Sequence, residues 1–203
     1  MKKIALAICF MSFLVGNIFS QGDFRFGIQA SPSFSWMGTD DNSINNNGTN
    51  LGLRLGMVGE YYFAENYAFT SGLNFAFNQG GTLRHDTGGN FWTRSELSNP
   101  DFNNSETALP DGVNLKYSIQ FVEIPIGLKM RTQEFGYLRY YAELPIFTIG
   151  IKTQAVGDIT GTNIMTEKEN IKNDVNSLNV SWGLGGGVEY TINSSTSLSL
   201  IHI

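Results

Sequence analysis

Apolar and polar residues alternate over unusually long stretches of this chain. In residues 24–36 the even positions are apolar or proline, and the odd positions are polar or small. Segments 51–63 and 178–192 repeat the alternation. A side-chain period of two indicates β-strands, and these segments are longer than the strands of about 5 or 6 residues that are common in soluble proteins. The chain is therefore predicted to be all-β.

The remaining strands and their connections predict an antiparallel meander. Further strand candidates lie at 67–79, 115–131 and 137–152, and a last one begins near Ser197. Short and long connections alternate: the short ones are 64–66, 132–136 and 193–196, and the long ones are 38–49, 80–114 and 153–177. The long connections are rich in Asn, Gly, Asp, Ser and Thr, as solvated loops are. We expect short turns at one end of the sheet and long loops at the other.

Alternation alone does not say whether the apolar face points inward, as in a β-sandwich or a soluble cup, or outward into lipid. After residue 20 no apolar run approaches the roughly 20 residues of a spanning helix, so membrane insertion requires a β-barrel. Aromatic residues cluster near the strand ends, as in interfacial girdles. Those near the short turns are Phe24, Phe26, Tyr61, Phe63, Tyr67, Phe69, Phe135, Tyr137 and Tyr190, and those near the long loops are Trp36, Phe77, Tyr117 and Trp182. The pattern favours an antiparallel up-and-down transmembrane β-barrel, with a sandwich core as the alternative.

The polar face of the strands carries charges of both signs. A small barrel has an interior that side chains fill, and charges buried there must pair or stay hydrated. We therefore predict a structural ion-pair cluster in the lumen, with a catalytic carboxylate pair as the alternative. Its predicted members are Arg54, Glu60, Glu123, Lys129, Arg139, Glu143 and Glu189.

Two strands change their apolar phase next to a proline. In 115–121 the odd positions are apolar, whereas in 122–130 the even positions are, and a similar change occurs at Pro145. A β-bulge would turn the following side chains to the other face, or 115–121 would project beyond the bilayer. Pro125 and Pro145 are predicted strand irregularities, because proline removes a ladder donor. The two Glu-x-Pro motifs are expected at similar height.

The N-terminus predicts export. Residues 1–20 combine Lys2 and Lys3 with an apolar core, as in a signal peptide, which leaves 21–203 as one barrel domain. Its removal would take the only cysteine and would reduce Lys plus Arg from 13 to 11 against 18 Asp plus Glu, a net charge of −7. A nucleic-acid partner is therefore not expected.

No motif for catalysis or for a cofactor stands out. His85 beside Asp86 lies in a long connection, and a catalytic role for this pair is a minor alternative. The glycine run at 183–187 alternates with apolar residues in a strand and lacks the helix of a nucleotide loop. We expect no enzyme activity, no cofactor and no metal.

Several segments together resemble the PorT-type outer-membrane β-barrel family. They are FGIQASPSFS, GLRLGMVGEYYF, YSIQFVEIPIGLKMR, YAELPIFTIGIK and WGLGGGVEY, and the resemblance extends over nearly all of the chain after the leader. The resemblance implies an eight-stranded barrel in the outer membrane of a Gram-negative bacterium. It also implies a role in protein export through a dedicated secretion system, the process with which the family's named member is associated.

The sequence contains six full strand candidates and the start of a seventh, ending in SLSLIHI. Because bacterial barrels close with an even number of strands, the last strand or strands are expected to be missing or incomplete. Two functions are compared. The first is a non-enzymatic outer-membrane protein, embedded in lipid, that assists export or presents loops 38–49, 80–114 and 153–177 to a secretion or envelope protein. The second is a secreted soluble β-barrel that carries an apolar ligand.

Overall fold

The protein forms one antiparallel β-sheet that follows the chain up and down. The computed structural model describes residues 23–99, 102, 109–193 and 196–202, so the expected signal peptide at 1–20 lies outside the described residues. The strands are β1 (Asp23–Ser35), β2 (Ile44–Ala64), β3 (Tyr67–His85), β4 (Val113–Arg131), β5 (Leu138–Gly161), β6 (Ile164–Asn170), β7 (Leu178–Asn193) and β8 (Thr196–His202). Within the described chain, no helix is long and apolar enough to cross a membrane.

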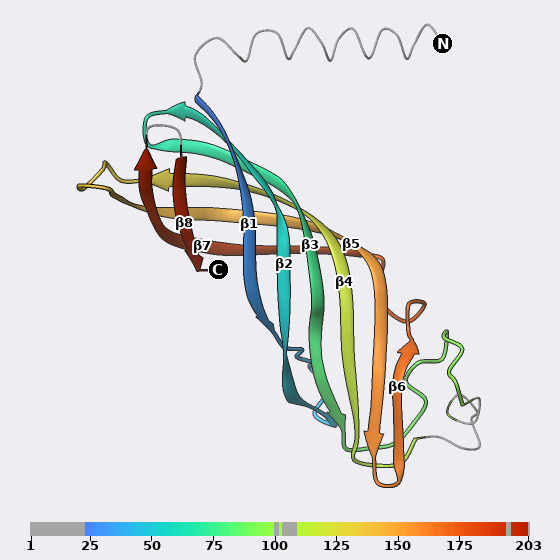
Figure 1. Ribbon diagram of the computed structural model, residues 1–203. Helices are drawn as coiled ribbons and strands as arrows, with labels where there is room; N and C mark the ends of the chain where they lie inside the picture. The colour runs from blue at the N-terminus through green and yellow to red at the C-terminus, as the bar shows by residue number, and fades with distance from the viewer. Residues whose placement is uncertain (1–22, 100–101, 103–108, 194–195, 203) are drawn as a thin grey trace, which may run out of the picture.

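The sheet is a curved wall with two edges. Its order is β1-β2-β3-β4-β5-β7-β8, and β6 pairs with the end of β5 outside this path. Figure 1 shows the long strands coiling around a common axis, with the short turns at one end and the long connections at the other. The sheet is therefore an up-and-down half-barrel in which β1 and β8 are the edges, and the all-β meander predicted from the alternation is confirmed.

The apolar face of the wall points outward. Phe26, Ile28 and Trp182 are 83%, 91% and 73% exposed, whereas the residues between them in sequence face the inside of the curve. Water would strongly disfavour such a continuous apolar surface, and lipid would not. A soluble barrel that carries an apolar ligand has the reverse arrangement, so that alternative does not fit this structure.

The strands are longer than the sequence predicted, and the loops are correspondingly shorter. β3 continues to His85 and β5 to Gly161, and β6 lies inside the segment predicted as the loop 153–177. The reason is that these extensions bury apolar side chains such as Leu83 and Ile159 under a separate layer of chain. Their polar residues face outward, and the sequence composition therefore resembled that of solvated loops.

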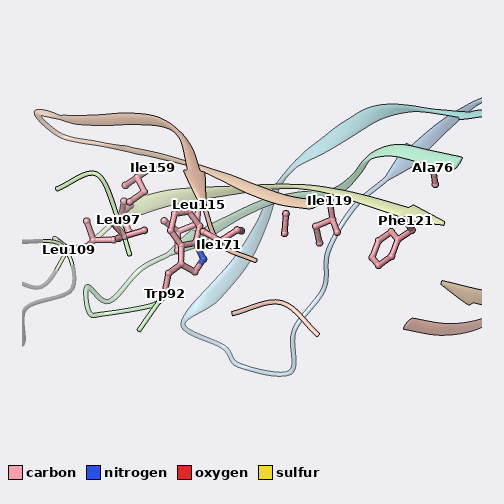
Figure 2. Packing of buried hydrophobic residues seen from close by; sticks show 11 residues of the cluster. Ala76, Trp92, Leu97, Leu109, Leu115, Ile119, Phe121, Ile159 and Ile171 are labelled. Atoms are coloured by element: carbon pink, nitrogen blue, oxygen red, sulfur yellow. The ribbon is translucent and has the colours of Figure 1, made fainter. Parts of the chain in front are cut away.

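These extensions carry a folded domain-like region, which we call the head. It consists of residues 44–50 of β2, 80–85 of β3, 113–121 of β4, 153–161 of β5, all of β6, and the described residues of 86–112 and 171–177. Its hydrophobic core comprises Trp92, Leu97, Leu109, Val113, Leu115, Ile119, Phe121, Ala155, Ile159 and Ile171, with Ala76 at its lower border. Figure 2 shows Trp92, Leu115, Ile159 and Ile171 gathered together, while Ile119 and Phe121 continue the line along β4.

Tyr117 belongs to this core and not to an aromatic girdle. Its ring meets the Trp92 ring edge to face, with 5.7 Å between the centroids, and Trp92 Nε1 donates a hydrogen bond to its hydroxyl at 3.2 Å. The prediction that Tyr117 faces lipid is therefore wrong. The other three aromatics predicted near the long loops, Trp36, Phe77 and Trp182, are exposed on the outward face.

The phase change in β4 does not involve a bulge in this strand. Leu115, Ile119, Phe121, Glu123 and Lys129 are all buried, so the odd positions face inward along the whole strand. What changes is the chemistry of the interior, which is apolar inside the head and charged toward the short turns. The bulge alternative is therefore wrong for β4, and projection of 115–121 beyond the bilayer stays a prediction.

The register shifts at this level lie in the neighbouring strands. β3 contains an extra residue between Ala76 and Gln79, where Asn78 has a φ of 55°, and β5 contains Thr153 as an extra residue opposite β4. A bulge of this kind bends its own strand and increases the local twist. The two bulges therefore flank β4 where the charged interior gives way to the head.

The two predicted proline irregularities differ. At Pro145, β5 holds two residues opposite one residue of both β4 and β7, which is a bulge, and the inward face changes there from Glu143 to Ile146. Pro125, in contrast, pairs with Thr148 without a register shift between β4 and β5. Its missing N–H falls where the β3–β4 ladder has no pair between Ser71–Ile126 and Asn74–Glu123.

Candidate functional site

A buried ammonium group binds two carboxylates in the half of the inner face that lies nearer the short turns. Lys129, from β4, is 2% exposed and pairs with Glu60 of β2 at 2.6 Å and with Glu189 of β7. β2 and β7 each lie two strands from β4 in the sheet. One side chain can reach both only because the sheet is strongly curved and because β3 places the small residue Ala68 opposite Lys129. We call Lys129, Glu60 and Glu189 the lysine cluster.

Aromatic rings surround the lysine cluster. The Lys129 ammonium lies 4.1 Å from the Tyr141 ring centroid, and the Tyr62 hydroxyl donates a hydrogen bond to Glu60 Oε2 at 2.7 Å. The Arg131 guanidinium stacks on Tyr62 at 3.8 Å. Cation–π contacts and charged hydrogen bonds are stronger where water is excluded, so these groups offset part of the desolvation of the three charges.

A second ion pair lies nearer the head. Arg54 of β2 and Glu123 of β4 approach to 3.2 Å, and the Glu123 side chain is 9% exposed. The amide of Gln29 donates to Asn74 at 2.8 Å, and that of Gln79 donates to the Ser33 hydroxyl at 2.9 Å. The inner face is thus filled by paired polar groups at several heights.

The structure does not bring all seven predicted cluster members together. Arg139 pairs with Glu134 of the neighbouring turn at 2.7 Å, because that carboxylate lies only five residues away in the chain. Glu143 lies opposite Lys129 in the β4–β5 ladder. The two Glu-x-Pro motifs are therefore not at similar height: the residue opposite Glu143 is six positions along β4 from Glu123, or about 20 Å. The predicted charges therefore do not form one cluster: the lysine cluster and the Arg54–Glu123 pair are separate, and Arg139 pairs with a residue outside the predicted set.

The His85–Asp86 pair does not have the arrangement of a catalytic dyad. The His85 ring stacks on Phe91 with 3.9 Å between centroids, and its Nε2 is buried without a hydrogen-bond partner. Asp86 instead pairs with Arg84 at 3.3 Å and accepts a hydrogen bond from Asn45 at 2.8 Å. The described residues also contain no group of three or more His, Cys, Asp or Glu side chains placed to hold a metal ion.

Two carboxylates, of Asp174 and of the buried Glu169, bind the connecting segments of the head. Asp174 accepts a hydrogen bond from the Arg94 amide at 3.0 Å and one from the Ser95 hydroxyl. Glu169 of β6 accepts from the Ser98 amide at 2.8 Å and from the Ser98 hydroxyl. These residues lie 71 to 80 positions apart in sequence, and only the fold reveals the pairing. The sole sequence signal was the presence of large apolar residues, Trp92 and Ile171, inside polar loops.

Lys152 is the cation that holds segment 171–177. Its buried ammonium donates to the carbonyl oxygens of Lys172 and Val175. The backbone N–H of Ile171 donates to the carbonyl oxygen of Ala155 in β5 at 3.2 Å. Within the segment, the backbone N–H of Asp174 donates to the carbonyl oxygen of Ile171 at 3.0 Å. Segment 171–177 is therefore anchored to β5 from two sides.

Replacing Lys152 by methionine should loosen this segment. Hydrogen bonds from a charged donor contribute about 1.5–3 kcal/mol, so the amides of Ile171 and Asp174 should exchange at least tenfold faster by hydrogen-exchange mass spectrometry. Lys172→Met is the matched control, because its exposed side chain is lost while its carbonyl acceptor stays. Equal exchange rates in the two variants would contradict the anchoring role.

Acid should loosen the head through His85. Burial lowers the pKa of His85 below its usual value of 6.5, against the opposing effect of Asp41. The folded head therefore favours the neutral ring, and the stabilisation is present above pH 6.5 and is lost as the pH falls through the depressed folded pKa. We expect limited proteolysis within 86–112 to accelerate between pH 7.5 and pH 5, and to change less in His85→Gln. An identical pH profile in that variant would assign the effect to other groups.

A curved antiparallel sheet with an apolar outward face, aromatics toward both strand ends and paired charges inside defines a transmembrane β-barrel protein. Comparison with family models agrees: the model of the outer membrane protein beta-barrel domain matches residues 19–203. The chain belongs to this family. No curated protein and no solved structure matches it significantly.

Proposed function

We propose that this protein is a non-enzymatic outer-membrane barrel that presents the head, on the outer side of the membrane, to a protein partner of the cell envelope. The observation that carries the proposal is the hydrophobic core of the head, which orders the long connections. Long connections of outer-membrane barrels face the exterior, whereas short turns face the periplasm. A preorganised surface binds with a smaller entropic loss than mobile loops do.

The inner face supports a structural and not a catalytic role for the charges. Glu60 and Glu189 both bind Lys129, and Glu123 binds Arg54, so each of these carboxylates has a cation partner. A general acid or base needs access to a substrate. The Lys129 ammonium instead lies under Tyr141.

Site-specific photocrosslinking in living cells would test the proposal. A photoreactive residue is placed at exposed head positions, Thr93, Glu96 or Asn173, and at the outward strand positions Ile28 or Val180 as matched controls. We expect a discrete protein adduct from the head only, and its loss in a variant whose head core is disrupted by Trp92→Ala. Protein adducts from none of the head positions would contradict the proposal.

A role in export is the more specific function that we propose for this partner contact. It is supported by the PorT-like segments, above all the EIP strand and the glycine-rich strand that ends in Glu189-Tyr190. Proteins released by a deletion strain are compared after complementation with wild type or with Trp92→Ala. We expect the set of released proteins to shrink in the deletion and to recover with wild type alone. Unchanged release would contradict the export role. The partner contact itself would still be tested by the crosslinking experiment.

A further inference from the structure

A groove of about 810 Å³ lies on the head, along the outer side of β4, β5 and β6. Its polar lining includes Lys116 and Gln154 from the two long strands, Asp158, and Lys168, Asn170 and Lys172 from the β6 region. Three lysines and two carboxylates, Asp158 and Glu167, line it. The groove thus carries a local positive balance on a chain whose net charge is −5.

The carboxylates do not neutralise all three lysines. Asp158 lies 3.7 Å from Lys116 and also accepts the backbone N–H of Lys168 at 2.9 Å. Among the described residues, no carboxylate lies within 4.0 Å of the ammonium group of Lys168 or of Lys172. Two cations of the groove are therefore available to an anion.

The backbone holds Lys168 in an unusual conformation. It has a φ of 59°, in the left-handed region that residues other than glycine rarely adopt. The register between β5 and β6 shifts here, with Glu167 and Lys168 opposite Asp158, and the Asp158 carboxylate binds the Lys168 amide. A strained position that its surroundings stabilise in this way points to a role for its side chain.

The groove begins where the lipid-facing band ends. Ile149 and Ile151 are the last exposed large apolar residues on the outward face of β5, and Thr153, which lines the groove, follows two residues later. Two residues of a strand span about 7 Å. The headgroup region on each side of a bilayer is about 5–8 Å thick, so the groove lies at headgroup height.

We propose that this groove binds the phosphate-bearing headgroup of a lipid of the outer leaflet, whose acyl chains lie on Ile149, Ile151 and the adjacent isoleucines of β4. Lys168 and Lys172 bind the phosphate, and Gln154 and Asn170 offer amide donors beside it. Charge complementarity and continuity with the lipid-facing surface support this occupant. The proposal is independent of the partner that the head contacts.

Native mass spectrometry of the refolded full chain in detergent tests the proposal. The probes are dipalmitoyl phosphatidate and dipalmitoylglycerol, which share their acyl chains and differ in the phosphate. We compare wild type with the double variant Lys168→Gln/Lys172→Gln. The control, Arg84→Gln/Arg94→Gln, removes the same charge from head positions outside the groove.

We expect wild type and control to retain phosphatidate and to bind dipalmitoylglycerol much more weakly. The groove variant should lose about 10- to 30-fold in apparent phosphatidate affinity, since each lysine near an anionic headgroup contributes about fivefold or slightly less. Equal affinity in the groove and control variants would overturn the proposal, as would equal binding of the two lipids. Full displacement of phosphatidate by millimolar inorganic phosphate would show a free-anion site and overturn it as well.

Discussion

Replacing Lys129 by methionine is expected to lower the free energy of unfolding of the barrel by about 3–5 kcal/mol. The reason is that Glu60 and Glu189, whose side chains are only 14% and 4% exposed, would keep their charges without a partner. Removing one partner of a buried ion pair is more destabilising than replacing the whole pair, because the remaining charge stays buried without a partner. Urea unfolding of the refolded protein in detergent, followed by Trp fluorescence, measures the change.

Two controls distinguish the effect of leaving buried carboxylates unpaired from the effect of losing a positive charge. Arg139→Met breaks the pair with Glu134 in the exposed turn and should change stability by less than about 1 kcal/mol. The triple variant Lys129→Met with Glu60→Gln and Glu189→Gln removes all three charges and should regain most of the loss. If Lys129→Met and Arg139→Met lower the free energy of unfolding equally, the lysine cluster does not stabilise the sheet more than an exposed ion pair does.

Replacing Trp92 by alanine should unfold the head and leave the wall intact. The Trp92 side chain is 2% exposed and packs on Tyr117 and against Gly157, and removing a buried Trp costs about 3–5 kcal/mol. We expect segments 86–112 and 171–177 to become sensitive to protease. Trp182→Ala, on the outward face, is the matched control and should leave the head resistant.

A second variant probes the same contact from the other side. A Cβ built on Gly157 would lie 2.4 Å from the Trp92 ring, so Gly157→Ala should displace the indole and reproduce the protease sensitivity of Trp92→Ala. Cold and boiled samples of each variant compared by electrophoresis report on the wall, which should keep its heat-modifiable mobility. A loss of that shift together with the head would show that head and wall fold as one unit.

The strands were predictable because the whole wall obeys one local rule. Alternation located β1, β7 and the lower parts of β2 to β5 within a few residues, and it required no knowledge of partners. The inward direction of Glu60, Glu123, Lys129 and Glu189 followed from the same period. Which of these charges pair was not predictable, because the pairing depends on the curvature of the sheet.

The head was not predictable for a related reason. Its strands have polar outward residues and a composition that resembles that of loops, and its core is assembled from contacts between distant segments. Asp174 and Ser95 are 79 positions apart, and Lys152 bonds to carbonyl oxygens that no sequence pattern marks. The sequence signal that was available, Trp92 and Ile171 inside polar segments, gains meaning only beside β4 and β5.

The unbroken inward face of β4 has a mechanical consequence. Because its odd residues pass from the charged interior into the core of the head without a break, one continuous strand belongs to both regions. A hinge would need backbone free of sheet pairing, and β4 pairs with β3 and β5 at both levels. The head is thus held at a fixed angle to the rest of the sheet. A pull along β4 would load many ladder hydrogen bonds in shear and would not peel them apart one at a time.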